Sequence, residues 1–182
     1  MKRYADDYEI QMEKDEKGRE KKVAVYRGNF YEVNLDEKHL IQLRKNSILL
    51  FLIILLLHIA GGFAANRGMY AFYVALPYVF AFLPIYFLGS SVLRIPKRKR
   101  LYHREEVELS FTRARKASLS LLILLGIVLL GEIIFLIWFF GDGIGLDLIF
   151  LGTIMLTTVP AFLLFRVLKT IQVTVSDDSY SE

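Results

Sequence analysis

Two ionisable side chains, His58 and Glu132, lie inside otherwise apolar runs of the sequence. Each run is long enough to cross a bilayer as a helix, and ionisable groups in such helices usually face the bundle interior and find a partner. Both runs are expected to travel in the same direction, which places His58 and Glu132 at a similar depth, somewhat outside the midplane. We therefore expect the two side chains to pair. A histidine beside a carboxylate is suited to carrying a proton or holding a cation.

Residues of the other two apolar runs are expected to complete a polar cluster with this pair. Tyr73 and Thr157 fall at a similar depth, so we predict an intramembrane polar cluster of His58, Glu132, Tyr73 and Thr157. One interpretation is a small transporter in which Glu132 exchanges a proton or cation and His58 relays it. The other is a buried polar clamp that fixes helix register, which is the more frequent role of a single acid–base pair. The sequence leaves both open.

Four apolar runs must position these residues: 47–66, 68–93, 117–140 and 145–168. Lysine and arginine alternate between the gaps, with 11 in residues 1–46 and 9 in the connection 94–116. The turn after the first run holds only Arg67, and the turn after the third holds none. Positive charge concentrates on the cytoplasmic side of membrane proteins. The sequence therefore predicts an all-α membrane bundle of four transmembrane helices, with both termini cytoplasmic, and we expect a bacterial cytoplasmic membrane.

The segments outside the runs alternate apolar and polar residues, as half-buried strands do. This alternation recurs in five places: 8–12, 23–25, 31–35, 107–111 and 171–175. Because an isolated meander of three strands is barely stable, we expect the two later strands to join the first three. The prediction is one small cytoplasmic antiparallel β-sheet, formed mainly by the N-terminal segment.

The predicted organisation has three parts. Residues 1–46 form a cytoplasmic β-meander followed by a short helix over 37–46, which Asp36 caps. Residues 47–168 form the four-helix transmembrane region, including the basic connection. Residues 169–182 form a cytoplasmic tail with a strand.

Small residues follow His58 on its own helical face. Gly61, Gly62 and Ala65 let another helix approach closely, so we expect them to serve helix packing, within the bundle or between two copies of the chain. A weak internal repeat also opens the first and third runs, where Arg44 and Arg115 each begin a basic–Ser–apolar junction. Two related hairpins fit this pattern, and so does the general preference of membrane insertion for such junctions.

The basic run Lys97, Arg98, Lys99 and Arg100 directly follows the second span. Topology alone demands positive charge there, so we interpret these residues as contacts for anionic lipid headgroups and not for nucleic acid. On the outer side, Asp142 and Asp147 flank glycines without the spacing of a calcium loop, which favours a plain glycine turn. We expect Arg67 on the opposite turn to pair with one of these carboxylates.

The sequence contains no cysteine, which excludes disulfides and cysteine-built metal sites. We identify no catalytic constellation, and we predict no metal and no cofactor. The leading interpretation is a non-enzymatic accessory or regulatory subunit that acts through protein or lipid partners at the cytoplasmic face. Its expected partners are the anionic bilayer and another membrane protein or a second copy of the chain. The alternative is the proton- or cation-coupled transporter.

Overall fold

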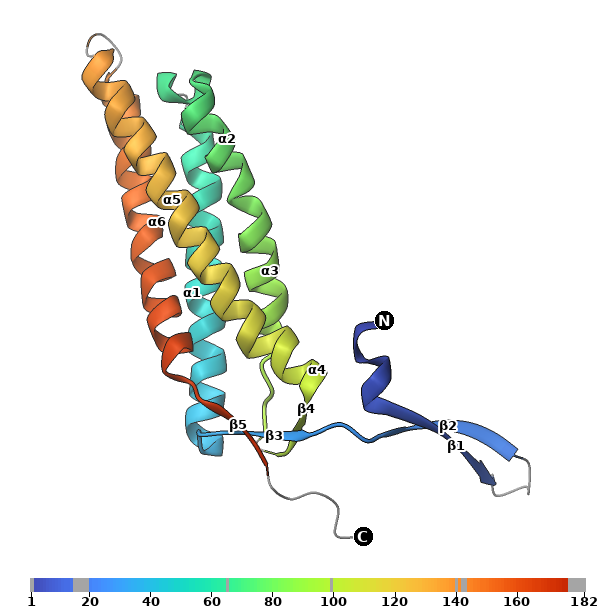
Figure 1. The fold of residues 1–182 in the computed structure, drawn as a ribbon. Coiled ribbons are helices and arrows are strands. Elements are labelled where there is room, and N and C mark those ends of the chain that lie inside the picture. Colours follow the sequence, from blue (N-terminus) through green and yellow to red (C-terminus); the bar gives the residue numbers. More distant parts are fainter. Residues whose placement is uncertain are drawn as a thin grey trace.

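The computed structural model describes residues 2–14, 20–64, 66–98, 100–139, 141 and 144–176. Within these residues, four helical segments are long and apolar enough to cross a membrane: Glu37–Phe63, Phe72–Leu93, Arg104–Trp138 and Ile144–Thr170. They form one bundle, with small antiparallel sheets at one end (Figure 1). All four segments expose large apolar side chains on their outer faces, as a bundle surrounded by lipid requires. The predicted fold class, that of an integral membrane protein with four spans, is confirmed.

The first span is a single helix, α1 (Glu37–Phe63). It merges the predicted short helix with the first apolar run, because no glycine or proline separates them and a helix that has begun propagates readily. Asp36 caps it as expected, since its Oδ1 accepts from the backbone N–H of His39 at 3.0 Å.

The second span is interrupted. A single 3₁₀ turn, η2 (Arg67–Tyr70), precedes α2 (Phe72–Phe80), and α3 (Phe82–Leu93) follows after Ala81. The interruption lies shortly before Pro84, whose ring has no N–H and crowds the carbonyl four residues earlier. The span therefore consists of two helices with a break near its middle.

The third span begins earlier than predicted, with α4 (Arg104–Val107) and a π-helical turn, η3 (Glu108–Thr112), running into α5 (Arg113–Trp138). The strand predicted at 107–111 is therefore wrong. Val107 and Phe111 are both buried, but as residues four apart on one face of a helix. An alternation of only five residues fits both the two-residue period of a strand and the 3.6-residue period of a helix. Continuity with the helix that follows, α5, selected the helix. The fourth span is α6 (Ile144–Thr170).

The helices close into a ring of four. α1 packs against α6 and α3, and α5 packs against α6, α2 and α3. Fully buried leucine and isoleucine side chains fill the centre: Ile54, Leu88, Leu121, Leu125, Ile154 and Leu164. Each antiparallel pair, α1 with α2–α3 and α5 with α6, is a hairpin.

The two hairpins are closed by equivalent arginines. Arg44 near the start of α1 donates to the carbonyl of Ile95, just beyond α3, at 2.8 Å. Arg115 at the start of α5 donates to the carbonyls of Leu168 and Ile171, at the end of α6, at 3.2 and 2.8 Å. Both guanidinium groups satisfy carbonyls in or just beyond the last turn of a helix, where intrahelical donors are lacking. The weak repeat in the sequence thus has the same structural role in both halves.

The strands form two sheets, not the single sheet expected. β1 (Tyr8–Lys14) pairs only with β2 (Glu20–Tyr26), whereas β3 (Phe30–Val33) lies between β4 (Tyr102–His103) and β5 (Val173–Val175). The tail strand therefore joins an N-terminal strand as predicted. The chain turns between β2 and β3 at Gly28, where a Cβ would lie 2.7 Å from Cζ of Tyr26. This turn separates the β1–β2 hairpin from the other strands.

Candidate functional site

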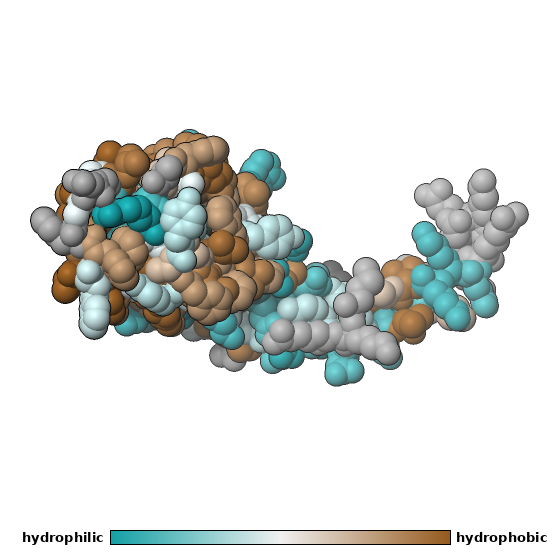
Figure 2. All heavy atoms as spheres, turned by 90° about the horizontal axis from the view of Figure 1, so that it is seen from above, coloured by the Kyte–Doolittle hydropathy of each residue, from teal (hydrophilic) through white to brown (hydrophobic). Residues whose placement is uncertain are grey.

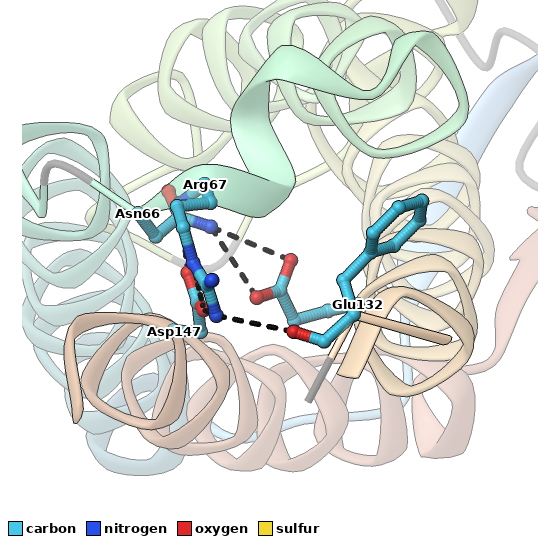
Figure 3. Close-up of polar contacts among 5 residues, drawn as sticks. Asn66, Arg67, Glu132 and Asp147 are labelled. Atoms are coloured by element: carbon cyan, nitrogen blue, oxygen red, sulfur yellow. Dashed lines mark hydrogen bonds and ion pairs between the residues drawn. The ribbon is translucent and has the colours of Figure 1, made fainter. Parts of the chain in front are cut away.

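A buried polar site lies at the end of the bundle opposite the sheets. There the turn between α1 and α2 meets Asp147 of α6 (Figure 3). The backbone N–H of Arg67 donates to Oδ1 of Asp147 at 2.7 Å, and Nε and Nη2 of its guanidinium donate to Oδ2 at 3.1 and 2.9 Å. Asp147 is fully buried. The expected pairing of Arg67 with a carboxylate of the opposite turn is confirmed for Asp147, while Asp142 lies outside the described residues.

Glu132 of α5 occupies the same site. Nδ2 of Asn66 lies 3.4 Å from both carboxylate oxygens, and both residues are buried. Gly68 approaches the carboxylate so closely that a Cβ there would lie 2.8 Å from Cδ of Glu132. A larger residue at position 68 would therefore have to displace the Glu132 carboxylate. We name the set Asn66, Arg67, Gly68, Glu132 and Asp147 the outer polar cluster.

Arg67 also joins the cluster to the end of α5. Its Nη2 donates to the carbonyl of Phe139 at 3.3 Å, and its guanidinium lies 6.0 Å from the ring centroid of Phe135. One arginine thus holds three segments, the α1–α2 turn, α5 and α6, at a single point. A charge-assisted pair of this kind is strong, because its carboxylate is removed from water and its donors are held in a fixed fork.

His58 is not part of this cluster. Its ring stacks on Tyr78 at 4.3 Å between centroids and meets Phe82 edge-on at 4.6 Å. The ring is fully buried, and neither of its nitrogens has a hydrogen-bond partner among the described residues. The hydroxyl of Tyr78 donates to the backbone carbonyl of His58, which ties α2 to α1. The predicted pairing of His58 with Glu132 is therefore corrected: His58 packs against the rings of Tyr78 and Phe82, and Asn66 binds Glu132.

Tyr73 and Thr157 also lie apart from the cluster. Tyr73 is 44% exposed and lies beside Gly131 of α5 on the outer surface. Thr157 is buried, but its hydroxyl donates to the carbonyl of Thr153 in its own helix at 2.8 Å. Of the four residues predicted to converge, only Glu132 lies in the outer polar cluster. The signal that sequence reasoning missed was Asn66, a polar residue directly before Arg67.

The small residues after His58 pack inside the bundle. A Cβ on Gly61 would lie 3.5 Å from Cγ2 of Thr153, and one on Gly62 would lie 2.9 Å from the hydroxyl of Tyr78. These glycines therefore bring α1 close to α6 and α2. Ala65 lies outside the described residues.

At the sheet end, the basic connection lines an open cleft of about 480 Å³. Lys97, Arg98 and Arg100 contribute to it, together with Glu105 and Glu106. Arg100 forms an ion pair with Glu106, whereas the side chains of Lys97 and Arg98 are exposed. Lys99, the fourth basic residue predicted to bind headgroups, lies outside the described residues.

The β1–β2 hairpin, which we call the arm, extends away from the bundle at this same end (Figures 1 and 2). Its base is an aromatic cluster: the ring of Tyr26 stacks on His103 at 4.1 Å and meets Tyr8 and Phe30 edge-on at 5.2 and 5.3 Å. The Tyr26 hydroxyl accepts from the backbone N–H of Arg104 at 3.1 Å, and it donates to the carbonyl of Asn29 at 2.9 Å. Burial of the hydroxyl raises the pKa of Tyr26. The base is thus anchored to α4.

No family model, curated protein or solved structure matches this chain significantly. Its function must therefore be inferred from its own geometry. Among the described residues, no group of three or more histidine, aspartate or glutamate side chains could hold a metal ion.

Proposed function

We propose that this chain is a non-enzymatic accessory or regulatory membrane protein that binds a partner through its arm. The arm carries this proposal. Ile10 is 70% exposed and Met12 is 62% exposed, and both lie on one face of β1. Figure 2 shows the arm reaching away from the bundle with apolar atoms on its surface. An apolar face on a two-stranded hairpin that projects into solvent gains stability when another protein covers it.

The partner we propose is another integral membrane protein lying beside this one in the bilayer. The arm projects sideways from the bundle, near the ends of the spans, so it reaches over the membrane and not along the bundle axis. The same end carries Lys97, Arg98 and Arg100, and positive charge at span ends favours a cytoplasmic location. We therefore assign the sheets and both termini to the cytoplasmic side of a bacterial cytoplasmic membrane, with anionic headgroups beside the basic connection.

Proton- or cation-coupled transport is the second candidate, because Glu132 is a fully buried carboxylate inside a membrane-spanning helix. Against it, Glu132 is bound by Asn66 and covered by Gly68, whereas His58 packs against the rings of Tyr78 and Phe82. A relay between the two therefore lacks the contact it requires. The outer polar cluster is better explained as a clamp between helix ends.

A photo-crosslinking amino acid placed at residue 12 tests the proposal in intact cells. The expected result is one discrete adduct with an integral membrane protein, identified by mass spectrometry. Ile10→Ser with Met12→Ser should abolish capture from a crosslinker at residue 24, which lies opposite Ile10 on the same face of the arm. Val23→Ser with Val25→Ser, a matched pair on the opposite face of the arm, should retain it.

Four outcomes decide against the proposal or change its partner. Equal adducts from residues 12 and 23, or no adduct, refute docking through the Ile10–Met12 face. An adduct of twice the chain's own mass replaces the partner with a second copy. Finally, loss of proton-linked flux in proteoliposomes on Glu132→Gln, with capture unchanged, establishes the transporter.

A further inference from the structure

A groove of about 680 Å³ lies between the α2–α3 span and α5, near the sheet end. Phe80, Pro84 and Phe87 form one wall, and Ala117 and Leu124 belong to the other. The groove exists because α5 presents small residues opposite the proline-containing segment of α3. Phe80 and Phe87 are themselves partly exposed, so the groove opens toward the surrounding lipid. Its volume falls in the range of small-molecule and lipid sites.

Basic and hydroxyl groups stand at one end of this groove. Arg113, Lys116 and Thr112 line it about two to three helical turns from Leu124. Neither Arg113 nor Lys116 forms an ion pair with another of the described residues, and the guanidinium of Arg113 lies 5.8 Å from the ring centroid of Phe87. From Lys116 to Leu124 the lining runs about 12 Å along α5, at about 1.5 Å per residue.

One acidic residue, Glu108, also lines the groove, but other groups engage its carboxylate. The hydroxyl of Tyr4 donates to its Oε2 at 2.8 Å, and Nε of Arg104 lies 3.6 Å from its Oε1. The unpaired charge at the mouth is therefore positive. Tyr4 itself lines the groove and belongs to the 3₁₀ segment Lys2–Asp7, which leads directly into the arm.

We propose that the groove binds one membrane phospholipid with an anionic headgroup. The phosphate lies between Arg113 and Lys116, with the hydroxyl of Thr112 as a further donor, and an acyl chain lies against Phe80, Phe87 and Leu124. Long basic side chains at a span end place their charge at headgroup level, while their stems cover apolar surface. An anionic phospholipid matches both ends of the groove, whereas an uncharged apolar molecule leaves the two cations unpaired. The site stands independently of the partner proposed for the arm.

Native mass spectrometry of the full chain, stripped of lipid and then titrated with phosphatidylglycerol or phosphatidylcholine, tests this assignment. Wild type should retain one phosphatidylglycerol in preference to phosphatidylcholine. Arg113→Gln with Lys116→Gln should weaken that binding about thirtyfold, at about fivefold for each basic residue near an anionic phosphate. Arg166→Gln with Lys169→Gln removes the same charge from exposed positions of α6 at the same end and should leave binding unchanged.

A second pair of variants tests the apolar end without changing charge. Ser120→Phe places a ring in the groove and should abolish retention of phosphatidylglycerol. Leu119→Phe alters the neighbouring position, which is 45% exposed and does not line the groove, and should have no effect. Equal losses in the charge variant and its α6 control, equal retention of the two lipids, or full retention by Ser120→Phe overturns the assignment. If a fatty acid displaces bound phosphatidylglycerol as effectively as added phosphatidylglycerol does, the requirement for a phospholipid is overturned.

Discussion

Gly68→Ala is the sharpest test of the outer polar cluster, because the structure assigns the cost of an added methyl group to one neighbour. The new Cβ lies 2.8 Å from Cδ and 2.9 Å from Oε1 of Glu132, well inside van der Waals contact. Overpacking of this kind costs about 1–3 kcal/mol. The smaller conformational freedom of alanine in the unfolded chain offsets about 0.4–1 kcal/mol of that cost. At the middle of these two ranges the net expected loss is about 1–2 kcal/mol.

For a chain of this size each kcal/mol corresponds to about 2–4 °C in the melting temperature, so Gly68→Ala should lower it by about 2–8 °C. The assay is thermal unfolding in detergent, followed by circular dichroism. The decisive comparison is Gly68→Ala in a Glu132→Ala background, where the obstructing carboxylate is gone and the same substitution should be neutral or stabilising. Gly126→Ala is the matched control, because nothing lies within 4 Å of its Cβ position. An equal loss in both backgrounds refutes the close contact that we assign.

Three further predictions concern hydrogen bonds at the ends of the bundle. A double-mutant cycle of Arg67→Ala and Asp147→Ala should give a coupling of about 1–2 kcal/mol in detergent unfolding, reduced by the partial exposure of the arginine, and additive losses contradict the pairing. The hydrogen bonds from His39 hold the pKa of Asp36 below its usual value of 3.8, so this cap stabilises α1 above that pH and loses its effect as the pH falls through the folded pKa. Asp36→Asn keeps the acceptor and should remove that dependence from an acid titration of helicity. Tyr26→Phe removes both hydroxyl bonds at the base of the arm and should raise hydrogen exchange in β2, at a cost of about 1 kcal/mol; unchanged exchange contradicts the anchoring role.

The spans could be predicted from the sequence because each consists of some 20 apolar residues, and lipid permits only a helix for such a stretch. The break at Ala81 could not be located as readily, since Pro77 and Pro84 both offered a reason to interrupt the span. The sequence predicts a strand at 107–111, where the structure has a helix, because Val107 and Phe111 satisfy either period. Packing against the bundle, which a local pattern does not contain, selected the helix.

Only part of the candidate site could be predicted from the sequence, because packing between helices again decided the rest. An ionisable residue within an apolar run is expected to be buried, and Glu132 is. The depth counted from the sequence is wrong, however, because Glu132 meets Asn66 and Gly68 beyond the end of α1, whereas His58 lies inside that helix. Packing also sets the rotation of each helix about its axis, which the sequence does not contain, and it stacks His58 on Tyr78. Arg67 and Asp147 were easier to pair, because both lie at the ends of spans on the same side.

The two hairpins are held by different contacts at the two ends of the bundle. At the sheet end, Arg44 and Arg115 each close their own hairpin through carbonyls of the returning helix. At the other end, Arg67 of the first hairpin holds Asp147 of the second, so the fastening joins the hairpins to each other. Relative movement of the hairpins is thereby restrained at the outer end. The sheet end is joined as well, since β3, which precedes α1, pairs with β5, which follows α6. The hairpins are therefore tied to each other at both ends, and Tyr4 links the α3–α5 groove to the segment that leads into the arm.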